Sequence, residues 1–311
     1  MKTIPRPLFI LLFFYSFILF LTSCKKEIDF DFHETESLVV IEGRVTNEGS
    51  SVVITKSRSV TDSVRPHCLT GALVTISADG KTTTLPYDAS TDSYCSSLKG
   101  VAGTTYELSV DLDGHHYEAS AYMSAPAPIL SAGFYWMTVL DERMLVYELW
   151  AVDPYPSERN QYWYRVDRIS HHPHFEGKQA TEPYRWGVID DRGFPPGKVF
   201  IDIMSTSEKA MDEDEEEQWK SILYDGDSIT CQLMTIDRPV YDYFSSLRAG
   251  QSGGANPRSN ITGGCLGYFA AGTVTRTDTI AFLRSNIKDW QKPLLEKPES
   301  SRHLSFSHPT H

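Results

Sequence analysis

The sequence has few cysteines, little helical periodicity and no surplus of basic residues, and each shortage excludes a class of protein. Apolar and polar residues alternate with a period of two almost everywhere, which predicts an all-β chain. Only 29 Lys and Arg residues stand against 41 Asp and Glu residues. A nucleic-acid partner is therefore not expected, because phosphate neutralisation requires a basic surface. No C-x-x-C pair is present, so the sequence predicts no zinc site of that kind.

The sequence also lacks an apolar run long enough for a membrane-spanning helix. Its longest run, Leu8 to Leu21, has roughly 14 residues, fewer than the ~20 that span a bilayer, and follows Lys2 and Arg6. A short apolar run behind a basic flank is typical of a secretory signal peptide. We therefore expect residues 1–23 to be removed.

Cys24 stands directly after this run, in "LTSC". The three residues before it resemble a bacterial lipobox, in which the cysteine becomes the acylated N-terminus. A diacylglycerol group together with an amide-linked acyl chain such as palmitate would give stable membrane attachment. The alternative is an ordinary secretory signal with a chance cysteine.

The residues after Cys24 predict where such a lipoprotein would be located. Lys25 occupies the second position, where Asp would signal retention in the inner membrane, and Glu27, Asp29 and Asp31 follow. This charged segment is similar to the export signal of Bacteroidota surface lipoproteins. Without Lys2 and Arg6, 27 basic and 41 acidic residues remain, a net charge of −14, which is ordinary for a module held at a cell surface. We expect an outer-membrane lipoprotein that faces outward.

Four further cysteines are expected to form disulfides, because an exported protein with an even number of them permits bridges. Four cysteines allow three connectivities, and local pairing costs least in loop closure. The predicted pairs are Cys68 with Cys95 and Cys231 with Cys265.

The strand patterns predict two antiparallel β modules. Residues 36–123 contain alternating runs around two Asp-Gly pairs, at positions 79–80 and 113–114, as in tight hairpins. This part is expected to be a small Ig-like or transthyretin-like sandwich. "SAPAPI", with Pro126 and Pro128, is the expected boundary. The expected division is a signal peptide at 1–23, a tether at 24–35, a small sandwich at 36–123, a linker at 124–129, a larger β-sandwich or barrel at 130–285 and a polar tail at 286–311.

One segment of the larger module has helical spacing. In "RPVYDYFSSLRAG", the residues Val240, Tyr243, Phe244 and Leu247 recur as on one face of a helix, with a proline at the start and a glycine at the end. The sequence therefore predicts a single helix in this all-β chain.

Several stretches together are similar to a known family. "LVVIEGRVT" after the acylated cysteine, "GALVTI", "GTTYELSVDLDGHHYEA" and "NITGGCLGYFAAG" resemble the Bacteroidota lipoproteins of the domain of unknown function family 4249, over nearly the whole mature chain. The family has no established activity, so the resemblance implies no catalytic residue and no cofactor. Its members are often encoded beside TonB-dependent outer-membrane receptors, which implies a role in nutrient capture or uptake with such a receptor as partner.

Three stretches raise alternative chemistries. "GQSGG" matches the G-x-S-x-G pattern around Ser252, but it follows the predicted helix, whereas a nucleophile elbow lies between a strand and a helix. "HHPH", with His171, His172 and His174, lacks the partners that would complete a metal shell. The acidic run Asp212 to Glu217 lacks the ligand spacing of an EF-hand, and whether it binds calcium stays open. We therefore predict no catalytic residue and no metal site.

Aromatic residues are the remaining signal for binding. Tyr and Trp present flat apolar faces with a polar edge, which suit sugars, peptides and protein interfaces, although every second aromatic in a strand normally faces the core. Trp163 and Trp186 are the candidate ligand-binding residues. The expected function is a lipid-anchored, non-enzymatic binding protein with an unidentified ligand. An anchored hydrolase using Ser252 and a purely structural or adhesive module are the alternatives.

Overall fold

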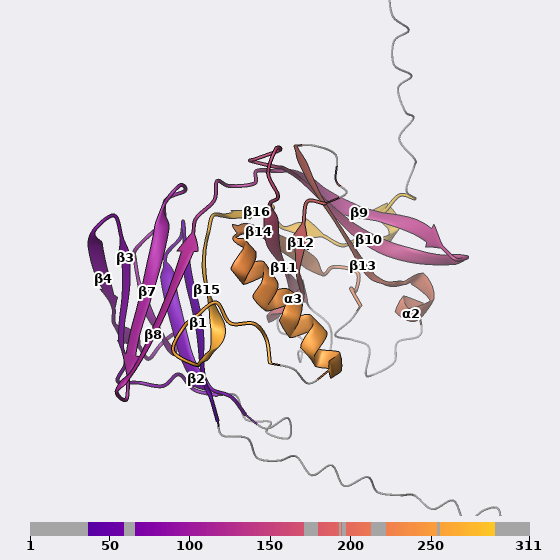
Figure 1. The fold of residues 1–311 in the computed structure, drawn as a ribbon. Coiled ribbons are helices and arrows are strands. Elements are labelled where there is room, and N and C mark those ends of the chain that lie inside the picture. The colour runs from indigo at the N-terminus through magenta and orange to yellow at the C-terminus, as the bar shows by residue number, and fades with distance from the viewer. Residues whose placement is uncertain are drawn as a thin grey trace, which may run out of the picture. The chain divides into compact units, whose positions relative to one another are not determined.

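The computed structural model describes residues 37–58, 66–170, 180–192, 194, 197–212, 222–253 and 256–289. Most of these residues lie in the strands of four β-sheets (Figure 1). The all-β class predicted from the alternation pattern is therefore confirmed. Within this part of the chain, no helix is both long and apolar enough to cross a bilayer.

The first sandwich consists of a five-stranded and a four-stranded sheet. In the first sheet the strand order is β15-β1-β2-β6-β5, and in the second it is β4-β3-β7-β8. The bounds are β1 (Val39–Thr46), β2 (Ser50–Lys56), β3 (Leu73–Ala78), β4 (Lys81–Leu85), β5 (Tyr87–Asp88), β6 (Ser93–Ser96), β7 (Thr105–Leu112), β8 (His115–Tyr122) and β15 (Leu266–Gly272).

Two Asp-Gly pairs form the tight hairpins that the sequence predicts. Asp79 and Gly80 join β3 to β4 with φ angles of 50° and 73°, and Asp113 and Gly114 join β7 to β8 with 51° and 79°. These left-handed conformations match the right-handed twist of the flanking strands, and Asp and Gly tolerate them best.

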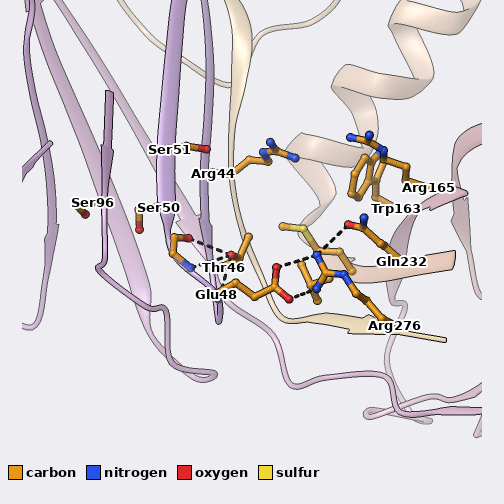
Figure 2. A pocket seen from close by; sticks show the side chains of 13 residues that line it. Arg44, Thr46, Glu48, Ser50, Ser51, Ser96, Trp163, Arg165, Gln232 and Arg276 are labelled. Carbon is orange, nitrogen blue, oxygen red and sulfur yellow. Dashed lines mark hydrogen bonds and ion pairs between the residues drawn. The ribbon is translucent and has the colours of Figure 1, made fainter. Parts of the chain in front are cut away.

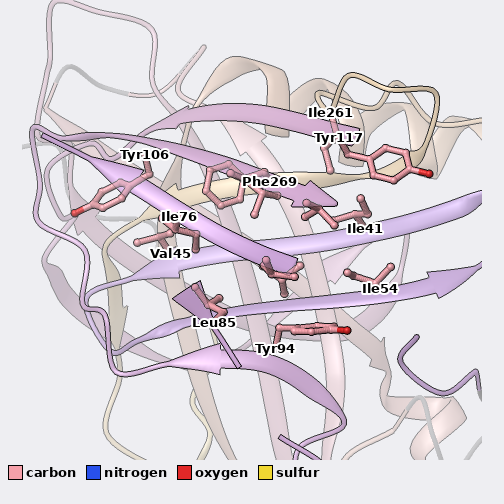
Figure 3. Packing of buried hydrophobic residues seen from close by; sticks show 14 of the residues in the cluster. Ile41, Val45, Ile54, Ile76, Leu85, Tyr94, Tyr106, Tyr117, Ile261 and Phe269 are labelled. Atoms are coloured by element: carbon pink, nitrogen blue, oxygen red, sulfur yellow. The ribbon is translucent and has the colours of Figure 1, made fainter. Parts of the chain in front are cut away.

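Strand alternation fills the first core. Ile41 and Val45 of β1 pack in this core together with Ile76 of β3 from the other sheet (Figure 3). Leu108 and Val110, alternate residues of β7, belong to the same buried cluster. The period of two therefore places one face of each strand in the core and leaves the intervening side chains on the outside.

Strand β15 joins this sandwich from far along the chain. It lies in the range 130–285 assigned to the larger module, yet it pairs in parallel with β1, with Gly43 opposite Phe269. Phe269 and Ala271 point into the first core, whereas Tyr268 and Ala270 belong to another apolar cluster. Both faces of β15 are buried, so this strand connects two cores.

Close backbone approach explains the glycine and asparagine around β15. Gly267 has a φ of +112°, and a Cβ atom there would overlap the Ile41 carbonyl oxygen. Asn260 donates its side-chain Nδ2 to the Phe269 carbonyl oxygen at 2.8 Å and accepts from the Phe269 N–H at 2.9 Å. The amide acts as a short strand partner for Phe269.

The second sandwich consists of a three-stranded sheet, in the order β13-β10-β9, and a larger sheet, in the order β12-β11-β14-β16 with β17 beside β14. Tyr162, Val166 and Cys231 lie in the apolar core formed by these strands. The bounds are β9 (Ile129–Val139), β10 (Glu142–Val152), β11 (Gln161–Ser170), β12 (Ala180–Asp190), β13 (Lys198–Ser207), β14 (Ser228–Ile236), β16 (Val274–Arg276) and β17 (Ile280–Ala281).

The predicted helix is confirmed as α3 (Arg238–Gly253), and two short helical turns, α2 (Glu208–Asp212) and η2 (Arg284–Asn286), accompany it. Asp237 caps α3, because its carboxylate accepts the Val240 N–H at 3.1 Å. Val240 and Tyr243 pack with Met234 of β14 and Tyr268 of β15 in a third apolar cluster. The helix thus covers the outer face of the second sandwich where β15 approaches it.

Hydroxyl groups hold the proline-rich segment between the sandwiches. Thr235, Thr273 and Thr275 donate to the carbonyl oxygens of Ala125, Ser124 and Ala127 at 3.0, 3.3 and 3.0 Å, respectively. The acceptors lie around Pro126 and Pro128, which have no N–H group of their own. The expected linker is therefore docked on β14 and on the segment that includes β16.

We predict that Asn260→Ala lowers the free energy of unfolding by about 1–3 kcal/mol, because both hydrogen bonds to Phe269 are lost at a part-buried site. Urea denaturation followed by circular dichroism measures the loss. The exposed Asn256 provides the matched control, since Asn256→Ala should shift stability by no more than about 0.5 kcal/mol. Equal effects of the two variants would contradict the role assigned to Asn260.

Candidate functional site

A cleft of about 420 Å³ lies where the outer faces of the two sandwiches meet (Figure 2). Strands β1 and β2 line one side, and β11, β14 and β16 line the other. The side chains that determine its chemistry are Arg44, Glu48, Trp163, Arg165, Gln232 and Arg276.

Strand alternation directs these side chains into the cleft. On β1, Val45 fills the first core, so its neighbour Arg44 projects from the opposite face. On β11, Tyr162 and Val166 fill the second core, so Trp163 and Arg165 project outward. The outward faces of two sheets therefore supply one shared site.

A polar network crosses the cleft. Arg276 of β16 forms a two-pronged ion pair with Glu48, in which Nη1 contacts Oε1 and Nη2 lies 2.8 Å from Oε2. The same Nη2 lies 3.4 Å from the Gln232 amide oxygen, and the Gln232 amide nitrogen donates to Asp167 at 3.0 Å. Asp167 also accepts from Arg165 Nε at 2.7 Å. The network thus connects the β1–β2 turn to the outer face of β11.

Asn47 fixes the spacing of the two walls. Its Nδ2 donates to the Val274 carbonyl oxygen at 3.1 Å, and its Oδ1 accepts from the Val274 N–H at 2.9 Å. This arrangement repeats the contact of Asn260 with Phe269, again with an amide in place of a strand. The loop after β1 is therefore attached to the start of β16.

Arg44 differs from the other two arginines in the cleft. Arg276 is paired with Glu48 and Arg165 uses its Nε for Asp167, whereas Arg44 makes no hydrogen bond or ion pair with any described residue. Its side chain extends from β1 toward Trp163 and Arg165 (Figure 2). The guanidinium groups of Arg44 and Arg165 thus both line the cleft near Trp163.

Trp163 and Trp186, the candidates from the sequence, lie together around Phe244 of α3. Trp163 stacks on Phe244 with ring centroids 6.5 Å apart, and Trp186 meets it edge-on at 5.7 Å. Only Trp163 lines the cleft, while Trp186 is 39% exposed outside it. Tyr268 packs against Phe244 from β15, and burial raises its pKa to about 12. The wall behind Trp163 is therefore apolar.

The predicted disulfides are wrong, because all four cysteines are free thiols in the structure. Cys231 lies in the core of the second sandwich and Cys265 in that of the first, so the expected partners belong to different cores. Cys68 also faces the first core, whereas the Cys95 sulfur lies 3.9 Å from an Asp88 carboxylate oxygen. Closeness in sequence therefore did not produce a disulfide in either predicted pair.

Other sequence candidates do not join the cleft. Ser252 lies in the last turn of α3, which is not the strand-to-helix turn of a nucleophile elbow. Cys24, the histidines of "HHPH" and residues 213–217 of the acidic run lie outside the described residues. Among the residues that the structure does describe, no three His, Cys, Asp or Glu side chains gather as metal ligands would.

Sequence reasoning missed the charged side chains of the site. The pattern held one usable signal, since Arg165 follows Trp163 by two residues and so shares its face of β11. Arg44, Glu48 and Arg276 gave no such signal, because only the docking of β15 and β16 brings them near Trp163.

Comparison with known proteins gives a family without an assigned activity. A family model described as a domain of unknown function, DUF4249, matches residues 25–278. No curated protein matches the chain.

We predict that native alkylation at pH 7.5 modifies Cys95 first. Cys95 is half-buried, whereas burial raises the pKa of Cys231 to about 12 and that of Cys265 to about 11, and also raises that of Cys68. Thiols with a raised pKa form little reactive thiolate near neutral pH. Iodoacetamide labelling with peptide mass spectrometry checks this order, and unfolding in urea should expose all four thiols. A pair of cysteines that resists labelling after unfolding and is labelled only after a reductant is added would contradict the free-thiol assignment.

Proposed function

The chain belongs to the DUF4249 family, which has no assigned activity, and we propose that it is a non-enzymatic binding protein whose ligand occupies the cleft beside Trp163. In this proposal, lipid on Cys24 holds the protein on the outer membrane, facing the cell surface. The ligand is a nutrient, and a TonB-dependent receptor is the partner that takes it up.

The volume and the lining of the cleft support a binding function. Binding sites for small molecules have volumes of roughly 300–1,000 Å³ and combine an apolar surface with a few polar groups that fix orientation. The cleft of about 420 Å³ offers the Trp163 ring, three guanidinium groups and the Gln232 amide. The Asn47–Val274 hydrogen bonds and the Glu48–Arg276 ion pair attach the loop after β1 to β16, so the two walls of the cleft are held together. This arrangement favours a preformed site.

The lipid anchor supports a role beside a membrane receptor. "LTSC" at residues 21–24 resembles a lipobox, and a tether confines the cleft to the membrane neighbourhood. Confinement raises the effective concentration of the bound ligand near any receptor in the same membrane. The family resemblance implies genes encoded beside those of TonB-dependent receptors, which favours such a receptor as the partner.

We predict that Cys24→Ala releases the protein from membranes, because the variant cannot carry the thioether-linked lipid. Detergent-phase partitioning and mass spectrometry of the N-terminal peptide measure attachment. Ser23→Ala provides a control, since a small residue is kept before the cysteine. If the Cys24→Ala variant attaches to membranes as well as the wild-type chain does, the proposed anchor is contradicted.

A second prediction tests the cleft itself. We expect a panel of neutral and charged saccharides, peptides and small acids to contain ligands that raise the Tm of the full-length chain. Trp163→Ala should remove this shift, whereas Trp186→Ala should retain it, because both rings pack on Phe244 but only Trp163 lines the cleft. Ligand shifts that survive Trp163→Ala, or a panel without any ligand, would contradict the proposed function.

The partner is best tested with these point variants and not by deleting residues 130–285. The deletion would remove β15, which supplies Phe269 and Ala271 to the first core, and so would disrupt both sandwiches. Co-purification of a receptor with the full-length lipoprotein, compared with the Cys24→Ala variant, tests the partnership with the fold intact.

A further inference from the structure

We infer that the cleft takes a small acidic saccharide, in which a carboxylate or sulfate group on a sugar ring lies between Arg44 and Arg165. This inference rests on the proposed binding function and adds to it the chemical class of the ligand.

The arrangement of charge in the cleft indicates an anion. Arg44, Arg165 and Arg276 line it together with a single acid, Glu48, although the chain as a whole has 41 acidic and 29 basic residues. Glu48 is engaged by Arg276, so it does not neutralise the other two arginines. Asp167 pairs with Arg165, and Glu42, two residues before Arg44 on β1, interacts electrostatically with Arg44. These carboxylates offset part of the positive charge, but the Arg44 guanidinium and the Nη groups of Arg165 keep their N–H donors.

Arg44 and Arg165 are the groups that have donors to offer. Arg44 has no hydrogen-bond or ion-pair partner among the described residues, and Arg165 has a partner only for its Nε, at Asp167. The positive charges of Arg44 and Arg165 repel each other across the cleft. An anion between them would remove that repulsion and accept hydrogen bonds from the N–H groups of both. Guanidinium groups suit carboxylate and sulfate groups because their N–H donors can contact two oxygens at once.

The remaining surface indicates a sugar ring next to that anion. The Trp163 side chain reaches the cleft while Phe244 packs against it from α3, so the indole ring is held in place. A fixed indole ring suits the C–H face of a pyranose ring. The Ser51 hydroxyl also lines the cleft, where it can donate or accept a hydrogen bond with a ligand hydroxyl.

The size and charge of the protein favour a short ligand over a long polyanion. The volume of about 420 Å³ suits a ligand of one or two rings. Outside the cleft the acidic residues predominate, so a densely charged polymer would be repelled along most of its length. One or two negative charges match Arg44 and Arg165 without meeting that repulsion.

The test is calorimetric titration of the full-length chain, with detergent present, using digalacturonic acid, its dimethyl ester and a sulfated galactose disaccharide. The ester keeps the rings but removes both negative charges. We expect the acid to bind at least tenfold more tightly than the ester. Arg44→Gln should weaken binding of the acid about tenfold and leave binding of the ester unchanged, because only the acid forms the ion pair.

Arg258→Gln is the matched control, since Arg258 is an exposed arginine that does not line this cleft. Tight binding of the sulfated disaccharide in place of the uronate, with the same dependence on Arg44, supports the inference and identifies sulfate as the anion. Equal affinity for acid and ester, or no effect of Arg44→Gln, overturns it. If only neutral or non-saccharide ligands bind in a Trp163-dependent manner, the inference fails while the proposed binding function stands, and the absence of any ligand overturns both.

Discussion

The parallel pairing of β1 with β15 joins the first sandwich to the apolar cluster under helix α3. One strand begins the described chain and the other comes near its end, so their pairing closes a long loop and carries a large entropic cost. Parallel strands cannot be joined by a tight turn, and here β2 to β14 and helix α3, with strands of both sandwiches, lie between β1 and β15. The burial of β15 on both faces, with Phe269 in one core and Tyr268 in another apolar cluster, offsets that cost.

The same pairing creates the cleft. Once β15 lies beside β1, the chain continues into β16, where Asn47 holds the Val274 backbone and Glu48 holds Arg276. Arg44 and Trp163 approach each other only because these contacts bring β1 near β11. The groups that line the cleft therefore come from elements whose contacts also stabilise the fold. This arrangement favours a rigid site on strands over a mobile site on loops.

The charge distribution separates the site from the remaining surface. The chain is acidic overall, yet arginines predominate in the cleft, and their charge is only partly compensated by Glu48 and Asp167. An acidic exterior favours solubility and repels polyanions. The proposed ligand carries one isolated negative charge close to Arg44 and Arg165, and this contrast in charge favours it over a polyanion.

The local structure could be predicted from the sequence, because strand alternation, Asp-Gly turns and helix caps depend on neighbours within a few residues. The hairpins at Asp79-Gly80 and Asp113-Gly114 and the helix around Val240 follow from such patterns. Three other features could be seen only in the fold. Leu266–Gly272 completes the first sheet, Cys231 and Cys265 lie in different cores, and Arg44 lines the same cleft as Trp163. These outcomes depend on pairing between residues far apart in the chain. A strand pattern indicates which face of a strand is buried, but it does not identify the strand's partner.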